Sequence, residues 1–410
     1  MAEGSRFSPP RRPNRWLAPL LVLVMAAALL LPRALMPVGA QSSGGAATSP
    51  SASAAQRRAF AGSNQPPLMQ PLPSRRRDAY QRLEPLPAAL RQAPAIRIGV
   101  HLENAYNLSV PDQTFMADGW YWLEWPEAVQ TMMEAEEIES DQLVEVVNNI
   151  IGYDFNVEAD NKEPMQRPDG SRYQLFRFSG SFYIDDLNLR DSPFNQLSLP
   201  LIFETRPPSF AIDGETPVLL IPSDDREGLM GAYATIRGYR ELGANIQALV
   251  HTYPTDFGDR STRSFAMTEM RVYYRTPWFT AFLQWVVPLL IVMAVVFLAP
   301  SLEGSLGELR LAIPSTALLT LVVMQQTYQA ELPPLPYLTF LDKLYVYCYL
   351  VSIGLFILFV WGTNRMAAAE REGGEGAVLA VRQGMDRADL VFQVVSLAGL
   401  VLVALLGWWF

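Results

Sequence analysis

Four long hydrophobic runs occupy the carboxy-terminal part of the chain, at about residues 279–299, 309–330, 337–361 and 390–410. Each run is close to the roughly 20 residues that an α-helix needs to cross the hydrocarbon core of a bilayer, at about 1.5 Å per residue. The pattern therefore predicts a transmembrane domain of four helices over residues 277–410.

The second of these runs is more polar than a helix that faces lipid on all sides. Read at helical spacing, one stripe carries a charged residue first, then small or hydroxylated residues, then apolar residues and an amide. Its members are Glu308, Ala312, Thr316, Leu319, Val323 and Gln326. Hydrocarbon cannot solvate polar groups, so such a stripe faces protein or a water-filled path. Two interpretations follow: the lining of a pore built from several copies, or a helix buried in a bundle.

Between about residues 95 and 275 the pattern changes to short alternating runs. These runs lie at 96–100, 120–125, 173–184, 197–203 and 265–274, separated by clusters of Pro, Gly, Asp and Asn. The alternation is typical of an antiparallel β-sandwich with one wet and one dry face. We assign residues 78–276 to this domain, and within it residues 228–242 look helical or form an irregular loop.

The first 77 residues read as export and linker sequence. Arginines precede an apolar run over 16–31, and the small residues at 38–40 suit a signal peptidase, so residues 1–40 are predicted to be a signal peptide. An uncleaved anchor is the alternative. Residues 41–77 are rich in Ser, Ala, Pro and Gln and predict a disordered linker.

The hydrophilic stretch 362–389 contains four arginines and is predicted to be a loop after the third span. Arginines beside spans favour the cytoplasmic side. This places the β-rich domain outside or in the periplasm, in a multi-pass protein of the inner (plasma) membrane.

The amino-acid composition and the absence of known motifs argue against several classes of function. Half of the residues are hydrophobic and 18% are charged, and the net charge of −9 argues against nucleic-acid binding. The single cysteine, Cys348, excludes an intramolecular disulfide and a thiolate metal cluster, and two histidines are too few for a histidine-rich metal site. No Walker loop, GxSxG, HExxH or dinucleotide fingerprint is present, so we expect neither an enzyme nor a cofactor.

Local motifs stand at characteristic places in this order of elements. They are Asp112-Gln113-Thr114-Phe115 followed by the tryptophan-rich 120–127, the stretch 155–158, Pro193-Phe194-Asn195-Gln196 within 187–197, Pro288 in the first span, and Leu332-Pro333 with 336–339 after the second. Together with the element order, they resemble the pentameric ligand-gated ion channel family, and its bacterial branch in particular. The resemblance covers residues 95–410 and implies a homopentamer in the lipid bilayer.

The resemblance implies a set of residues that couple the two domains. These are Asp112, Pro193, Phe194, Asn195, Arg275, Leu332 and Pro333. One departure is Asn195, which stands where the family has an aspartate near an arginine before the first span, here Arg275; Asp112 or Asp191 could supply the acid instead. A second departure is Pro314, which lies inside the second helix and predicts a kink in the lower pore.

For the pore, the resemblance implies a ring of five Glu308 side chains that attracts cations. Arg310 either counters this ring or turns away and pairs with a neighbouring helix. Rings of Leu319 and Val323 would close the pore by dewetting. The expected permeant ions are therefore cations.

For activation, the resemblance implies a small-molecule ligand or protons. Trp120, Tyr253 and Phe257 are candidates for an aromatic box that holds an amine, although aromatic residues in a sandwich also serve as core. The acidic cluster at 134–141 reads as a solvated face rather than a proton sensor. The alternative to a channel is a non-conducting, membrane-anchored ligand-binding receptor.

Overall fold

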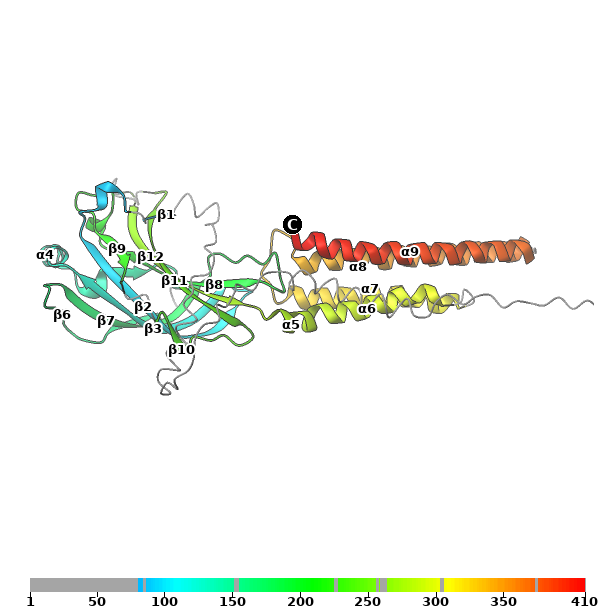
Figure 1. The fold of residues 1–410 in the computed structure, drawn as a ribbon, viewed down its shortest axis with the longest axis horizontal. Helices are drawn as coiled ribbons and strands as arrows, with labels where there is room; N and C mark the ends of the chain where they lie inside the picture. The colour runs from blue at the N-terminus through cyan, green and yellow to red at the C-terminus, as the bar shows by residue number, and fades with distance from the viewer. Residues whose placement is uncertain are drawn as a thin grey trace, which may run out of the picture. The chain divides into compact units, whose positions relative to one another are not determined.

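The computed structural model describes residues 80–83, 86–150, 155–224, 228–255, 258, 264–302, 306–372 and 375–409. The predicted signal peptide and linker lie outside these residues. The described chain forms two compact units: a β-rich unit that runs to Pro277, and a helical unit that comprises residues from Trp278 onward together with the loop segment Arg190–Pro193. A β-sheet-rich domain is thus followed by apolar helices (Figure 1).

The β-rich unit contains two sheets. The first has the strand order β1(Tyr80–Arg82), β11(Arg240–Thr252), β12(Ser264–Arg275), β8(Gln196–Thr205) and β4(Val144–Val146). The second has the order β10(Met230–Tyr233), β2(Ala95–Ser109), β3(Thr114–Trp125), β7(Arg172–Tyr183) and β5(Asn156–Ala159), with β6(Met165–Gln166) on β7 and β9(Leu219–Pro222) on β2. Pairing is antiparallel except that β9 and β10 run parallel to β2. The five alternating runs of the sequence correspond to β2, β3, β7, β8 and β12.

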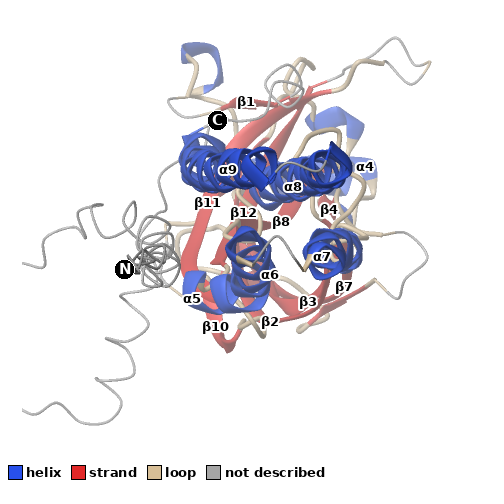
Figure 2. Cartoon of the chain, turned by 90° about the vertical axis from the view of Figure 1, so that its right-hand side faces the viewer, coloured by secondary structure: helices blue, strands red, loops and turns tan. Residues whose placement is uncertain are grey.

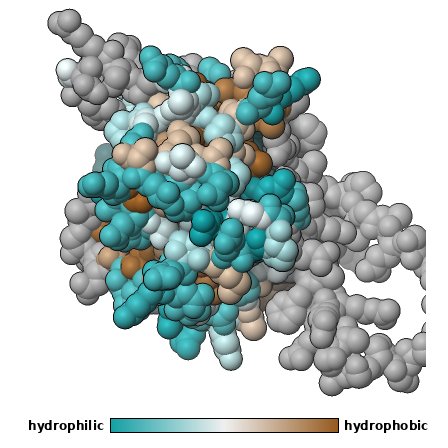
Figure 3. All heavy atoms as spheres, turned by 90° about the vertical axis from the view of Figure 1, so that its left-hand side faces the viewer, coloured by the Kyte–Doolittle hydropathy of each residue, from teal (hydrophilic) through white to brown (hydrophobic). Residues whose placement is uncertain are grey.

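One hydrophobic core contains residues from both sheets. Along β3 every second side chain is buried, as strand geometry requires when one face is dry. Tyr121 of β3 and Phe178 of β7 lie 5.3 and 6.4 Å, ring centroid to centroid, from Phe203 of β8. These aromatic contacts tie the two sheets together. The surface of the unit that Figure 3 shows is mainly hydrophilic, with scattered apolar residues.

Short helical segments connect the strands. Helix α4(Glu127–Glu136) follows β3, and 3₁₀ turns lie at Ala88–Leu90, Ser140–Gln142 and Pro208–Phe210. The helical reading of residues 228–242 is wrong, because this segment contains β10 and the start of β11. The segment is extended because it pairs with β2 and β12, which are distant in the sequence. Gly238 also adopts a φ of +85°, which an α-helix does not allow.

The helical unit begins with α5(Trp278–Ala281), a π-helical turn at Phe282–Val286 and α6(Val287–Leu298), which ends in a 3₁₀ turn at Ala299–Ser301. The wide turn directly precedes Pro288, whose ring cannot fit against the carbonyl of the preceding turn in a regular α-helix. Helix α7(Gly307–Gln329) continues through Pro314. Helices α8(Phe340–Glu372) and α9(Glu375–Trp409) complete the unit.

Within the described residues, four helices are long and apolar enough to cross a membrane. Helix α8 packs against both α7 and α9, and α6 packs against α7 (Figure 2). The predicted hydrophilic loop 362–389 is wrong: apart from residues 373 and 374, which are not described, α8 and α9 extend through it. Its Ala, Met, Glu and Arg residues are strong helix formers, so polarity alone does not end a helix.

Candidate functional site: the exposed face of helix α7

Helix α7 has two faces of different character. All six residues of the predicted pore stripe, from Glu308 to Gln326, are exposed in the single chain. Leu319 and Val323 are 66% and 54% exposed. The buried residues of the helix lie on the other side and are Arg310, Pro314, Ala317, Leu321 and Tyr328. The helix therefore packs by one face and leaves the mixed polar and apolar stripe uncovered.

The polar side chains of α7 differ in whether they need a hydrogen-bond partner outside the helix. The side chains of Ser315, Thr320 and Thr327 donate to carbonyl oxygens of their own helix, at 2.9–3.0 Å. These hydroxyls need no outside partner. The Glu308 carboxylate and the Gln326 amide are exposed on the stripe, and hydrocarbon cannot solvate them.

Behind the stripe, Arg310 forms a buried ion pair with Asp389 of α9. Its guanidinium carbon also lies 4.2 Å from the ring centroid of Phe359 in α8. Of the two arrangements open for Arg310, the structure shows the one in which the side chain turns away from Glu308. The sequence pattern places Asp389 at the end of a predicted loop and does not indicate that it pairs with Arg310.

A buried polar cluster links α7 to the start of α8, and sequence reasoning missed it. The Asp342 carboxylate accepts hydrogen bonds from the backbone and hydroxyl of Thr339, at 3.1 and 2.7 Å, and from Gln325 of α7 at 3.2 Å. Tyr349 donates to Gln325 at 2.7 Å, and Tyr328 to Thr339 at 2.9 Å. Thr339 and Asp342 cap the first turn of α8 and hold α7 beside it.

The loop segment Arg190–Pro193 belongs to the helical unit. The carbonyl oxygens of Arg190 and Ser192 accept hydrogen bonds from the backbone amides of Phe340 and Leu341, at 2.7 and 3.3 Å. The Arg190 guanidinium lies 5.3 Å from the ring centroid of Tyr337. The segment thus satisfies free amides at the start of α8.

The other predicted coupling residues differ in burial and in their hydrogen-bond partners. Pro193 and Pro333 are buried, while Phe194 and Leu332 are half-buried. Buried Asn195 accepts a hydrogen bond from the backbone amide of Thr276, at 3.2 Å, through its own backbone carbonyl oxygen.

Arg275 is exposed, and the described part of the β-rich unit forms no ion pair with it. The Asp112 carboxylate instead accepts the Ser109 hydroxyl, at 2.7 Å. The Asp112–Arg275 pair, one of the two options for this arginine, is therefore absent from the β-rich unit as described.

The two aromatic ligand candidates that the structure describes, Trp120 and Tyr253, lie on, or directly after, strands of different sheets. Trp120 is half-buried on β3 of the second sheet, with the Arg177 guanidinium 5.6 Å from its ring centroid. Tyr253 follows β11 of the first sheet and donates its hydroxyl to Glu204 at 2.8 Å. Burial and the charge of Glu204 raise the pKa of Tyr253, so its hydroxyl stays protonated. Phe257 lies outside the described residues.

His251 belongs to a titratable cluster that the sequence pattern does not reveal. Its Nδ1 lies 2.6 Å from the Glu204 carboxylate, and its ring stacks on Tyr80 with centroids 4.7 Å apart. Glu145 of β4 pairs with Glu204 in the strand register. Partial burial and then the charge of Glu204 raise the pKa of Glu145.

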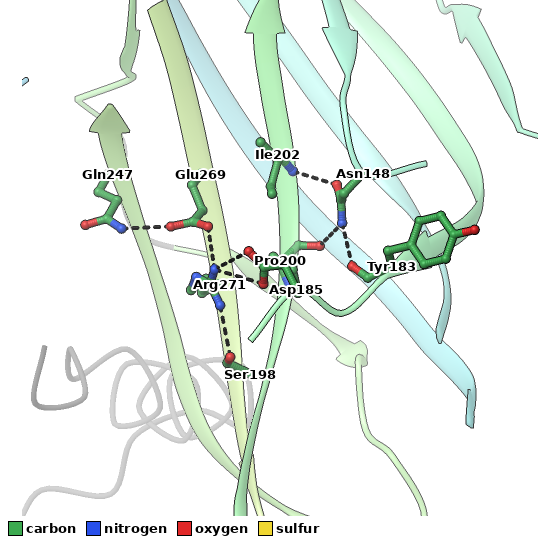
Figure 4. Close-up of polar contacts among 9 residues, drawn as sticks. All are labelled: Asn148, Tyr183, Asp185, Ser198, Pro200, Ile202, Gln247, Glu269 and Arg271. Atoms are coloured by element: carbon green, nitrogen blue, oxygen red, sulfur yellow. Dashed lines mark hydrogen bonds and ion pairs between the residues drawn. The ribbon is translucent and has the colours of Figure 1, made fainter. Parts of the chain in front are cut away.

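A second buried charge network lies on the first sheet (Figure 4). Arg271 donates to Ser198 at 3.0 Å, to both oxygens of Asp185 at 3.0 and 2.9 Å, and to Glu269 at 2.7 Å. Gln247 donates to the other oxygen of Glu269 at 2.8 Å. This network satisfies its charges internally. The described residues contain no group of three His, Cys, Asp or Glu that could hold a metal ion.

No family model matches this sequence, and no curated protein matches it.

Proposed function

We propose that this chain is the subunit of a pentameric, cation-selective, ligand-gated ion channel. In this proposal the β-rich unit is a β-sandwich that receives the stimulus, and the four helices form a transmembrane bundle. The observation that carries it is the two-faced character of α7, whose predicted pore residues are all exposed while its opposite face is packed. In a ring of identical subunits this face of each α7 would line a water-filled path at the centre, and water would solvate its polar groups.

Ion selection in this proposal comes from charge at one end of α7. Five Glu308 carboxylates form an acidic ring that concentrates cations and repels anions. The neighbouring positive charge of Arg310 is withdrawn and neutralised by Asp389. Rings of Leu319 and Val323, both strongly exposed in the single chain, form the apolar constriction that closes the pore by dewetting.

Coupling runs through the loop segment Arg190–Pro193. The chain enters and leaves this segment from the β-rich unit, and its carbonyl oxygens hold the amides of Phe340 and Leu341. Asp342 then connects the start of α8 to Gln325 of α7. Displacement of the loop would therefore move α8 and α7 together, and a ligand opens the pore if it binds the open form more tightly.

The stimulus in this proposal is a small molecule or protons acting on the β-sandwich. The subunit is a multi-pass protein of the inner (plasma) membrane, with the β-sandwich outside or in the periplasm. Its partners are the lipid bilayer, the permeating cations and four further copies of the same chain.

The test is current through liposome-reconstituted or oocyte-expressed protein, over a pH series and with a panel of primary amines. Leu319→Ser should give larger or spontaneous current, because a hydroxyl ring wets the constriction. Leu350→Ser on α8 is the matched control, since Leu350 is 64% exposed but lies outside the stripe. Glu308→Ala should weaken cation preference. Equal effects of the two serine variants would contradict the assignment of α7 to the pore.

A non-conducting receptor is the second candidate. Pro314 inside α7 favours it, because a proline in a pore helix loosens the wall that must select ions. Arg275, for which the described β-rich unit provides no acidic partner, also favours it. Silence of the wild type and every variant, with pentamers shown at the membrane, would establish this candidate instead.

A further inference from the structure

We infer that Asp389 of α9 is a positioning residue that sets the ion selectivity of this pore, by holding the charge of Arg310 behind α7. The inference rests on the proposed channel function. It assigns a role in permeation to a side chain on α9, a helix that contributes none of the predicted pore lining.

The first step is the placement of two opposite charges on α7. Glu308 and Arg310 are two positions apart, which separates them by about 200° around an α-helix. Glu308 is exposed on the stripe and Arg310 is buried on the packed face. Both charges lie at the same end of the helix, so both contribute to the potential at that mouth of the pore.

The second step is how Arg310 is confined. The side chains of Arg310 and Asp389 are 6% and 10% exposed. The ring of Phe359 closes the guanidinium off from the side of α8. The Arg310 Nε has no hydrogen-bond partner in the described structure, and among the described residues Asp389 is the one carboxylate paired with Arg310. The neutralisation of Arg310 therefore depends on a single residue of another helix.

The third step is electrostatic. Five unpaired guanidinium groups at that mouth would oppose the Glu308 ring, and five unpaired Asp389 carboxylates would reinforce it. A unit charge about one helix diameter from the ion path, at an effective dielectric constant of about 20, changes the local cation concentration by about tenfold and the anion concentration by about tenfold in the opposite direction. Pairing cancels the two contributions, so the Glu308 ring alone determines the preference.

The experiment measures reversal potentials under a salt gradient, and from them the cation-to-anion permeability ratio. Asp389→Asn should lower this ratio by about tenfold or more, because five such charges act together while salt screens part of their effect, and Arg310→Gln should raise it by a comparable factor. The double variant, which removes both charges, should return to the wild-type ratio. Glu370→Gln is the control: Glu370 is exposed on α8, about three turns beyond Phe359, and should leave the ratio unchanged.

A structural role alone would not produce opposite shifts from the two single variants, nor restoration in the double variant. Unchanged ratios, or shifts in the same direction, would overturn the inference while the channel function stands. If Asp389→Asn fails to reach the membrane, Arg310→Gln and the double variant still decide the sign. Absence of current from wild type, Leu319→Ser and all charge variants would overturn the proposed function and this inference with it.

Discussion

Each unit of the molecule buries an arginine, and the two are held in different ways. Arg271 of the β-rich unit donates four hydrogen bonds, to a hydroxyl and two carboxylates, on neighbouring strands and the segment after β7 (Figure 4). Among the described residues, Arg310 of the helical unit pairs with one carboxylate, from another helix, and its Nε has no hydrogen-bond partner. Loss of one acidic partner leaves Arg271 with a second counter-ion, whereas loss of Asp389 leaves the Arg310 charge unpaired among the described residues.

The largest expected effect comes from removing the shared cation of the β-rich network. Arg271→Met leaves Glu269, whose side chain is 0% exposed, as a buried carboxylate without its cation. We expect a loss of about 3–5 kcal/mol in the free energy of unfolding. Chemical unfolding of the full chain, followed by tryptophan fluorescence, measures it. Arg240→Met, at an exposed position on β11, is the control, and equal stability of the two variants would contradict the network's role.

A smaller effect is expected at the cluster that joins α7 to α8. Asp342→Ala removes the first-turn cap of α8 and the acceptor for Gln325, so we expect a loss of about 2–3 kcal/mol. Asp342→Asn keeps acceptor oxygen for Thr339 and should lose less. The thermal midpoint of the detergent-solubilised protein measures both. If Asp342→Ala is as stable as the wild type, the role assigned to this cap is contradicted.

Redundancy itself is tested by removing one of the two acidic partners of Arg271. Asp185→Asn leaves Glu269 in place, so Arg271 keeps a counter-ion and the expected loss is only about 1–2 kcal/mol. The same chemical unfolding assay applies. A loss as large as that of Arg271→Met would show that the network is not redundant.

The smallest effect is a change in pH dependence at Glu145. Because its pKa is raised in the folded protein, the folded state keeps a proton that the unfolded state has already released. Its contribution is therefore most favourable below the ordinary pKa of 4.5 and is lost as pH rises through the raised folded value. Glu145→Gln should be slightly more stable than wild type near neutral pH and equal to it in acid. Lower stability of the variant at neutral pH would contradict this account.

Local pattern predicted the regular elements better than their partners. The alternation in β2, β3, β7, β8 and β12 and the four apolar helices follow from periodicity and hydrophobic length. The structure of residues 228–242 and 362–389 was predicted wrongly, because strand pairing and helix extension there depend on contacts outside the local sequence.

The buried polar groups could not be predicted for the same reason. Arg310 and Asp389 are 79 positions apart, and His251 and Glu204 are 47 apart. The stripe on α7 was visible as a period in the sequence, and its exposure agrees with that period. Its assignment to a pore stays a prediction, as do the roles of Trp120, Tyr253 and Arg275.

The distance between Arg310 and Asp389 along the chain also sets an order of events during synthesis. The two residues are separated by 79 positions, which a ribosome covers in about 4–16 s. Throughout that interval α7, the most polar of the four apolar helices, carries a cation whose partner does not yet exist. The packing partners α6 and α8 precede α9, so the ion pair is the contact of α7 that waits for α9. A chain that ends before α9 therefore leaves the Arg310 guanidinium without the carboxylate that neutralises it in the complete subunit.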